Sequence, residues 1–223
     1  LPAILGWDDP GAAFTAALPL GTEAAVLLYF RQDLWNIGRD WLISLRRPEM
    51  RGQINPRMGW YLIIATIPIS ILGLAFQDQI ETAARNLWLV GSMLIVFGLV
   101  LGWADRVGTR ERDVEQLSFR DGVAIGLAQS LALIPGVSRS GATISAGLFL
   151  GLGREAAARF AFLLAIPAVV LSGFYELYKL LSGKESFDEP MINIAVATLV
   201  AFVVGYAVIA WFLRYLTSHS MSV

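Results

Sequence analysis

The chain contains no cysteine and only one histidine, and these two shortages exclude several kinds of functional site. Without cysteine there is no disulfide framework, no thiol nucleophile and no thiolate metal site. The one histidine, His219, lies near the chain end with no second histidine to share a metal ion, and we interpret it as an interfacial tail residue. The formal net charge is −1, so no global basic field favours nucleic acid as a partner.

Charged residues are also scarce, at 16% of the chain, whereas hydrophobic residues make up 56% and the mean hydropathy is +0.61. This composition is too apolar for an ordinary soluble domain. Several segments with almost no charge approach the roughly 20 residues that cross the hydrocarbon core of a bilayer. We therefore predict an all-α, polytopic helical membrane protein with a single membrane domain over residues 1–223. The expected spans are residues 12–30, 59–76, 87–104, 160–181 and 191–213.

Arginines gather in alternate connections, which predicts an orientation because basic residues in short loops stay on the cytoplasmic side. The first long connection, between residues 31 and 57, is rich in arginine. The charge run from Asp105 to Glu115, which we expect to be a solvated loop, belongs to the same side. Arg120 and Arg154 flank residues 122–152 and fall on this side too.

The segment 122–152 therefore has to enter the membrane and return, as a re-entrant helix-loop-helix broken at Pro135-Gly136. At about 1.5 Å per residue, its two halves would each reach near the midplane. Irregular backbone at that depth is tolerated where protein or a water-filled cavity covers it. The alternative is a single kinked span that carries Arg139 across the membrane.

The loop of this segment holds the most informative residues of the chain. Residues 134–143 read Ile-Pro-Gly-Val-Ser-Arg-Ser-Gly-Ala-Thr, and Arg139 stands between two uncharged stretches. A cation at that depth costs about 2.5–3.5 kcal/mol on insertion scales, so it calls for a functional reason. A planar guanidinium can bind two phosphate oxygens at once. Three hydroxyl groups surround it in the sequence, those of Ser138, Ser140 and Thr143.

We expect a helix to begin near Ser138, with its unpaired N–H groups and its positive dipole end directed at the loop. Such an end is a ready anion site. Ser138 or Ser140 can cap it, while Gly136 and Gly141 let the backbone approach a ligand closely. The sequence thus predicts a phosphate-binding loop inside the bilayer. The alternative is that the serines and glycines only let membrane helices pack closely.

Two further residues are candidates for the substrate site. Gln129 precedes the loop on the first half-helix, where it could line the site or bond another helix. Glu23 lies inside an apolar span, where it could face the cavity or sit at the outer interface. No metal ligands are identified from these residues.

The motif Pro-Gly-Val-Ser-Arg-Ser-Gly-Ala-Thr resembles the second signature of the undecaprenyl-diphosphate phosphatase (bacitracin-resistance) family. The resemblance runs along nearly the whole chain. It includes Leu20-Gly21-Thr22, Tyr29-Phe30-Arg31, Ala65-Thr66-Ile67-Pro68, Gly151-Leu152-Gly153-Arg154-Glu155-Ala156 and Phe160-Ala161-Phe162-Leu163-Leu164-Ala165-Ile166-Pro167.

The resemblance implies a multi-pass enzyme of the bacterial inner (plasma) membrane. Such an enzyme removes the terminal phosphate of undecaprenyl diphosphate and so recycles the lipid carrier of cell-wall synthesis. It also implies inverted repeats, a site facing the outer side, and Mg²⁺ or Ca²⁺ as a cofactor. Carried over by position, Arg139 would grip the diphosphate, with Ser138, Ser140 and Thr143 around it. The partners are then the polyprenyl diphosphate and membrane lipids, and a homodimer is left open.

In this family a glutamate-rich first signature, ending in Ser-Ser-Thr-Gly-His, supplies the likeliest metal ligands. By position it belongs before Leu1, and a final spanning helix belongs after Val223. We therefore expect the given sequence to be a fragment that is inactive alone. A second function remains open on the residues, a transporter or flippase for an anionic or lipid-phosphate substrate, because broken helices suit that role equally well.

Overall fold

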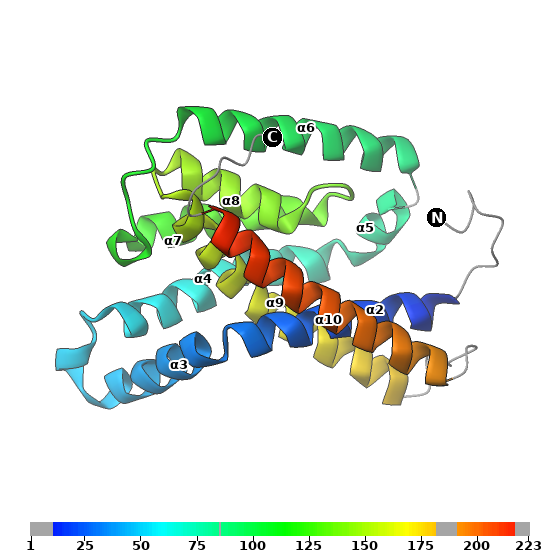
Figure 1. Cartoon of the computed structure of the whole chain (residues 1–223), viewed down its shortest axis with the longest axis horizontal. Helices are drawn as coiled ribbons and strands as arrows, with labels where there is room; N and C mark the ends of the chain where they lie inside the picture. Colours follow the sequence, from blue (N-terminus) through cyan, green and yellow to red (C-terminus); the bar gives the residue numbers. More distant parts are fainter. Residues whose placement is uncertain (1–10, 85, 182–190, 217–223) are drawn as a thin grey trace. The chain divides into compact units, whose positions relative to one another are not determined.

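The structure is a computed structural model, and it describes residues 11–84, 86–181 and 191–216. His219 lies outside the described residues. The described part is helical, as predicted, with its elements joined by short turns (Figure 1). The longer helices are α2 (Gly11–Tyr29), α3 (Arg31–Arg46), α4 (Ile54–Ala75), α6 (Leu87–Val107), α9 (Arg154–Leu181) and α10 (Met191–Leu216). The shorter ones are α5 (Gln77–Ala84), α7 (Phe119–Ser130), α8 (Arg139–Phe149) and the 3₁₀ turns η1 (Pro48–Met50), η2 (Val114–Gln116) and η3 (Leu131–Leu133).

Three of the described helices are long and apolar enough to cross a membrane: residues 54–75, 87–107 and 192–216. The middle one, α6, exposes large apolar side chains such as Ile95 and Leu99 along most of its length. Exposed apolar surface of that extent suits contact with lipid. The helices extend past several expected spans, for example α9 from residue 154 instead of 160, because polar residues at their ends continue the helix.

The chain divides into two compact units, residues 1–30 with 169–211 and residues 31–168 with 212–223. In the first unit α2 and α10 run parallel and in close contact. A β-carbon at Gly21 would meet the backbone of Thr198, and one at Gly205 would touch Thr22 and Ala25. Small residues that let two backbones approach are typical of packing between membrane helices.

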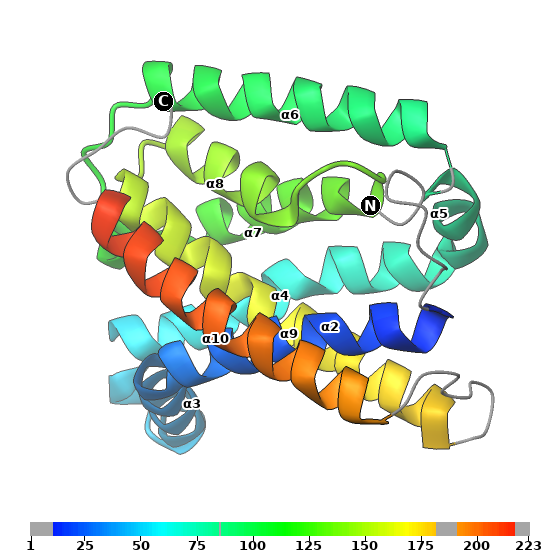
Figure 2. The ribbon, with the colours of Figure 1, turned by 45° about the vertical axis from the view of Figure 1, so that its right-hand side comes forward.

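The second unit contains the arginine motif, and its helices form a row in the order α6, α8, α7, α4, α3 (Figures 1 and 2). α7 runs parallel to α4, with Gly122 against Tyr61 and Gly126 against the backbone of Ala65. α8 runs parallel to α6 and packs beside it. The pair α7 and α8 therefore forms a hairpin, held between two apolar helices long enough to cross a membrane.

The connection from residue 31 to 57 is not a simple loop, since most of it is the amphipathic helix α3. α3 folds back on α4, where Asn55 donates a hydrogen bond of 2.7 Å to Asp40 and Gly59 makes room for Trp41. This bond from Asn55, followed by one from Arg39, lowers the pKa of Asp40 despite burial. α3 is not apparent from the sequence, because its charges resemble those of a cytoplasmic loop.

Candidate functional site

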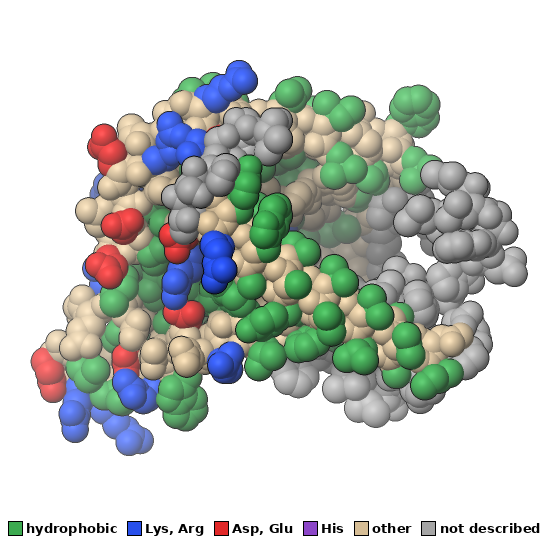
Figure 3. Space-filling view, viewed as in Figure 1, with side chains coloured by type: hydrophobic (Ala, Val, Ile, Leu, Met, Phe, Trp, Pro, Cys, Tyr) green, Lys and Arg blue, Asp and Glu red, His purple; other side chains and the backbone are tan. Residues whose placement is uncertain are grey.

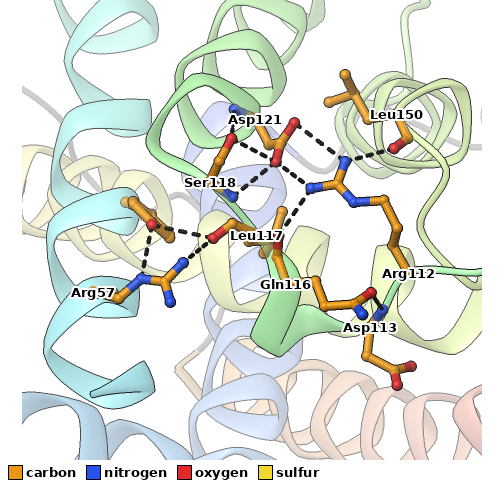
Figure 4. A network of polar contacts seen from close by, with 9 residues as sticks. Arg57, Arg112, Asp113, Gln116, Leu117, Ser118, Asp121 and Leu150 are labelled. Atoms are coloured by element: carbon orange, nitrogen blue, oxygen red, sulfur yellow. Dashed lines mark hydrogen bonds and ion pairs between the residues drawn. The ribbon is translucent and has the colours of Figure 1, made fainter. Parts of the chain in front are cut away.

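The base of the α7–α8 hairpin is closed by a polar network centred on Arg112 (Figure 4). The Arg112 guanidinium donates to Asp121 near the start of α7 at 2.6 Å and to the Leu150 carbonyl after α8 at 2.7 Å. The backbone of Arg112 also pairs with Gly151 and Gly153. The two ends of the hairpin therefore meet at one point, so the chain leaves the hairpin where it entered.

A second contact fixes this base to α4. The Arg57 guanidinium donates to the Leu117 carbonyl and to the Tyr61 hydroxyl, and that hydroxyl donates to Leu117 as well. Beside it, Arg154 at the start of α9 binds Asp105 near the end of α6 through two hydrogen bonds, of 2.6 and 3.0 Å. Charged side chains gather at this end of the unit on the face drawn in Figure 3.

The prediction that residues 105–115 form a solvated loop is therefore wrong in part. Asp105 is only 2% exposed, and Arg112 holds the hairpin closed. Burial alone would raise the pKa of Asp121, but hydrogen bonds from Arg112 and Ser118 outweigh burial and lower it below its ordinary value. The bond to Asp121 correspondingly raises the pKa of Arg112.

The tip of the hairpin lies at the opposite end from this base. Its backbone turns at Gly136, whose φ of +94° is easily adopted only by glycine. A β-carbon at Gly136 would collide with the backbone of Val90, in the first turn of α6. The tip is therefore level with the start of α6, whereas Phe149 at the base contacts Trp103 near the end of α6. Extended backbone at Ile134 and Ser138 adds more length per residue than a helix would.

α8 begins directly after this loop and carries the predicted anion-binding groups in its first turn. Ser138 is its N-cap and accepts a hydrogen bond of 3.2 Å from the Gly141 N–H. The Ser138 and Ser140 hydroxyl oxygens lie 3.2 Å apart, and both side chains are exposed. Arg139 is the first residue of the helix and is half-buried. The predicted helix start and cap are confirmed.

The other candidates have different surroundings. Thr143 is 1% exposed, and its hydroxyl donates to the carbonyls of Arg139 and Ser140, so it is directed at its own helix. Gln129 is fully buried in α7, and neither its amide nitrogen nor its amide oxygen has a hydrogen-bond partner. Glu23 is half-buried on α2, in the other unit.

A cavity of about 210 Å³ lies beside the first turn of α8. Its polar edge is formed by Ser138 and Ser140, together with Gly136 and Gly141. The rest of its lining is apolar and comes from three other helices and the next turn of α8: Leu94, Phe97, Gly98, Leu101, Ile144, Phe162 and Phe212. These wall residues were not predicted from the sequence. The signal that could have found four of them is their helical spacing, which puts Leu94, Phe97, Gly98 and Leu101 on one face of α6.

The donor set around α8 suits an anion better than a cation. It offers a guanidinium, two hydroxyls and the positive end of a helix, and these attract phosphate oxygens. Among the residues that the structure describes, no three His, Cys, Asp or Glu side chains are grouped so that they could hold a metal ion. The described residues around α8 therefore offer no ligand set for the divalent cation that the resemblance implies.

The family model described as "Bacitracin resistance protein BacA" matches residues 1–223. The chain belongs to this family. It is 57% identical over 220 residues to the undecaprenyl-diphosphatase of Nocardioides sp. (strain ATCC BAA-499 / JS614), covering 98% of this chain and 79% of that protein. It is 56% identical over 218 residues to the undecaprenyl-diphosphatase of Mycolicibacterium smegmatis, covering 96% and 78%. As a BacA family member with three such apolar helices, it is a membrane protein.

Proposed function

We propose that this protein hydrolyses undecaprenyl diphosphate to undecaprenyl phosphate and inorganic phosphate. The names of its relatives support this activity over transport. The structural observation that carries the proposal is the first turn of α8, where Ser138 and Ser140, the sequence neighbours of Arg139, line one edge of an otherwise apolar cavity. The substrate has the same two parts, a strongly anionic head and an apolar chain.

In this reaction the terminal phosphorus gains an oxygen from water and the bond to the bridging oxygen breaks. The bridging oxygen leaves with the lipid monophosphate. Negative charge builds up on the phosphate oxygens in the transition state, so groups already aimed at them lower the barrier. Arg139 supplies a full positive charge for this purpose, and the N-terminal N–H groups of α8 supply partial charges. Either serine hydroxyl can donate a hydrogen bond to the same oxygens.

The location follows from the same features. We place the protein in the bacterial inner membrane as a multi-pass protein, with the arginine-rich hairpin base on the cytoplasmic side. The α7–α8 hairpin would then be re-entrant, and its tip would lie towards the outer side. The tip is level with the first turn of α6, which follows the connection with few arginines.

The decisive test is Arg139→Ala in the purified full-length protein, measured as phosphate released from undecaprenyl diphosphate. We expect kcat to fall by about 10³-fold or more, as when an arginine that stabilises a phosphoryl transition state is lost. Arg139→Lys should retain part of the activity, because charge remains but the planar fork is lost. Arg106→Ala is the matched control, since Arg106 is an exposed arginine at the end of α6. Unchanged hydrolysis by Arg139→Ala would overturn the assignment.

We also propose a divalent cation, Mg²⁺ or Ca²⁺, as a cofactor, on the strength of the family resemblance. Treatment with EDTA should then stop phosphate release, and adding back Mg²⁺ or Ca²⁺ should restore it. Full activity in excess EDTA would contradict this part of the proposal and leave the role of Arg139 standing.

A further inference from the structure

The apolar cavity beside α8 lies along α6, between two places where α6 contacts the hairpin. At the tip, Val90 packs against Gly136. At the base, the Trp103 ring packs edge-on against Phe149, with centroids 5.3 Å apart. Between these contacts the face of α6 presents Gly98, and a β-carbon there would meet nothing within 4 Å. The missing side chain leaves the space open.

The far wall of the cavity is aromatic. Phe162 of α9 and Phe212 of α10 contact each other edge-on, with ring centroids 6.4 Å apart and planes at 86°. Phe97 of α6 completes this set, and all three rings line the cavity. Rings in edge-on contact are rigid and expose apolar surface without a polar group to satisfy. Such a wall suits a hydrocarbon with double bonds and methyl branches.

The polar edge and the apolar wall belong to one continuous space. The same cavity that is lined by Ser138 and Ser140 is lined by Leu94, Gly98 and Phe162. A ligand with its phosphate at the first turn of α8 therefore has its next atoms inside the apolar part. The 210 Å³ volume would hold roughly seven heavy atoms, at the volume that a water molecule takes in the liquid. That is one five-carbon isoprene unit and the start of a second.

We propose that this cavity binds the isoprene unit next to the diphosphate, and that Gly98 determines whether the unit can enter. This inference rests on the proposed function and adds to it a specificity-determining residue. The remainder of the chain continues from the cavity into the lipid. Binding the first unit here places the diphosphate at the first turn of α8, which begins with Arg139, because the two parts of the ligand are covalently joined.

The test fills the cavity by adding a side chain at Gly98, where a β-carbon has room. In Gly98→Leu, the new side chain occupies the space that we assign to the first isoprene unit. Each buried methylene strengthens binding by roughly a factor of four, so displacing two or more should raise KM about tenfold or more. The substrate is farnesyl diphosphate, a soluble three-unit polyprenyl diphosphate. Inorganic pyrophosphate, which has no hydrocarbon, serves as a competitive inhibitor that probes the anion site alone.

The expected result is a higher KM for farnesyl diphosphate with an unchanged inhibition constant for pyrophosphate, and a smaller rise in KM for Gly98→Ala. Gly102→Leu is the matched control, since Gly102 is one turn further along α6, also meets nothing within 4 Å, and does not line the cavity. Its KM should remain that of the unaltered protein. If Gly98→Leu fails to fold, Phe97→Ala decides instead, because it removes a wall without adding bulk and should raise the same KM.

Three outcomes would count against the inference. Equal KM values for Gly98→Leu and Gly102→Leu would show that the cavity does not hold the chain. If Gly98→Leu raises the KM for farnesyl diphosphate and the inhibition constant for pyrophosphate by the same factor, the cavity belongs to the anion site only. If Gly98→Leu does not fold, an unchanged KM for farnesyl diphosphate in Phe97→Ala would overturn the inference. All variants are made in the full-length protein; if that protein without substitutions hydrolyses no diphosphate at all, the proposed function itself has failed, which is a distinguishable result.

Discussion

Arg112 and Asp121 are joined by hydrogen bonds of 2.6 and 3.4 Å, and this pair ties the loop after α6 to the start of α7. Since the same guanidinium also donates to the Leu150 carbonyl, one arginine closes both ends of the hairpin. Neither side chain is fully exposed, at 33% for Arg112 and 10% for Asp121. The pair is therefore better shielded from water than an ordinary surface ion pair.

Replacing Asp121 by Asn should loosen this base and change how stability depends on pH. The pKa of Asp121 is lowered below its ordinary 3.8, so its contribution is complete above that value and is lost as the pH falls through the lower, folded-state value. Loss of hydrogen bonds to a charged group costs about 2 kcal/mol, or roughly 4–8 °C in melting temperature for a chain of this size.

Thermal unfolding of the detergent-solubilised protein at pH 7 and at pH 3 measures both effects. The melting temperature of Asp121→Asn should be lower at pH 7 and should fall less on acidification than that of the unaltered protein. Glu155→Gln, at an exposed carboxylate, is the control and should change neither value. The prediction would be contradicted if acidification lowered the melting temperature of Asp121→Asn as much as that of the unaltered protein.

The re-entrant path can be tested by labelling, and the absence of cysteine makes this direct. Single cysteines are introduced at the exposed positions Arg120, Glu155 and Asp78, and intact cells are treated with a membrane-impermeant thiol reagent. We expect Arg120→Cys and Glu155→Cys to be protected together and Asp78→Cys to be labelled. If only one of the positions 120 and 155 were labelled, the two would lie on opposite sides of the membrane, which would exclude a re-entrant hairpin.

The features that could be predicted from the sequence are those that depend on residues close together in the chain. The break at Pro135-Gly136 and the cap at Ser138 follow from residue types that stop or start a helix wherever they occur. The long helices follow from uncharged runs. The arrangement of the site around Arg139 was predictable for the same reason, because its residues are neighbours in the sequence.

The features that the sequence did not reveal depend on partners far along the chain. Nothing local indicates that Asp105 is buried by Arg154, 49 residues away. The cavity wall is built from residues of α6, α9 and α10, and the sequence of any one helix does not indicate that the three come together. Thr143 shares a face with Ser140 by spacing, as expected, but a serine or threonine hydroxyl in a helix can also bond its own backbone, and here it does.

Substituting Gly136 by Ala should disrupt the tip of the hairpin. Alanine is strained at a φ of +94°, and its β-carbon would collide with the Val90 backbone, so the loop has to move away from α6. We expect phosphate release to fall by at least tenfold, since displacement of the loop misplaces Ser138 and Arg139. Gly91→Ala, at a helical glycine with nothing within 4 Å, is the control and should keep full activity. Equal activity of the two variants would show that the tip is not held against α6.

Gln129 offers a test of a different kind, because its whole side-chain amide is buried without a hydrogen-bond partner. An unsatisfied buried polar group costs about 1–3 kcal/mol, so an apolar residue of similar size should be more stable there. We expect Gln129→Leu to raise the melting temperature by roughly 2–12 °C at this chain length. Ser130→Ala is the control, since Ser130 bonds its own helix at Gly126 and should shift the value little. A lower melting temperature for Gln129→Leu would mean that the amide is paired in the membrane, most simply with a bound water.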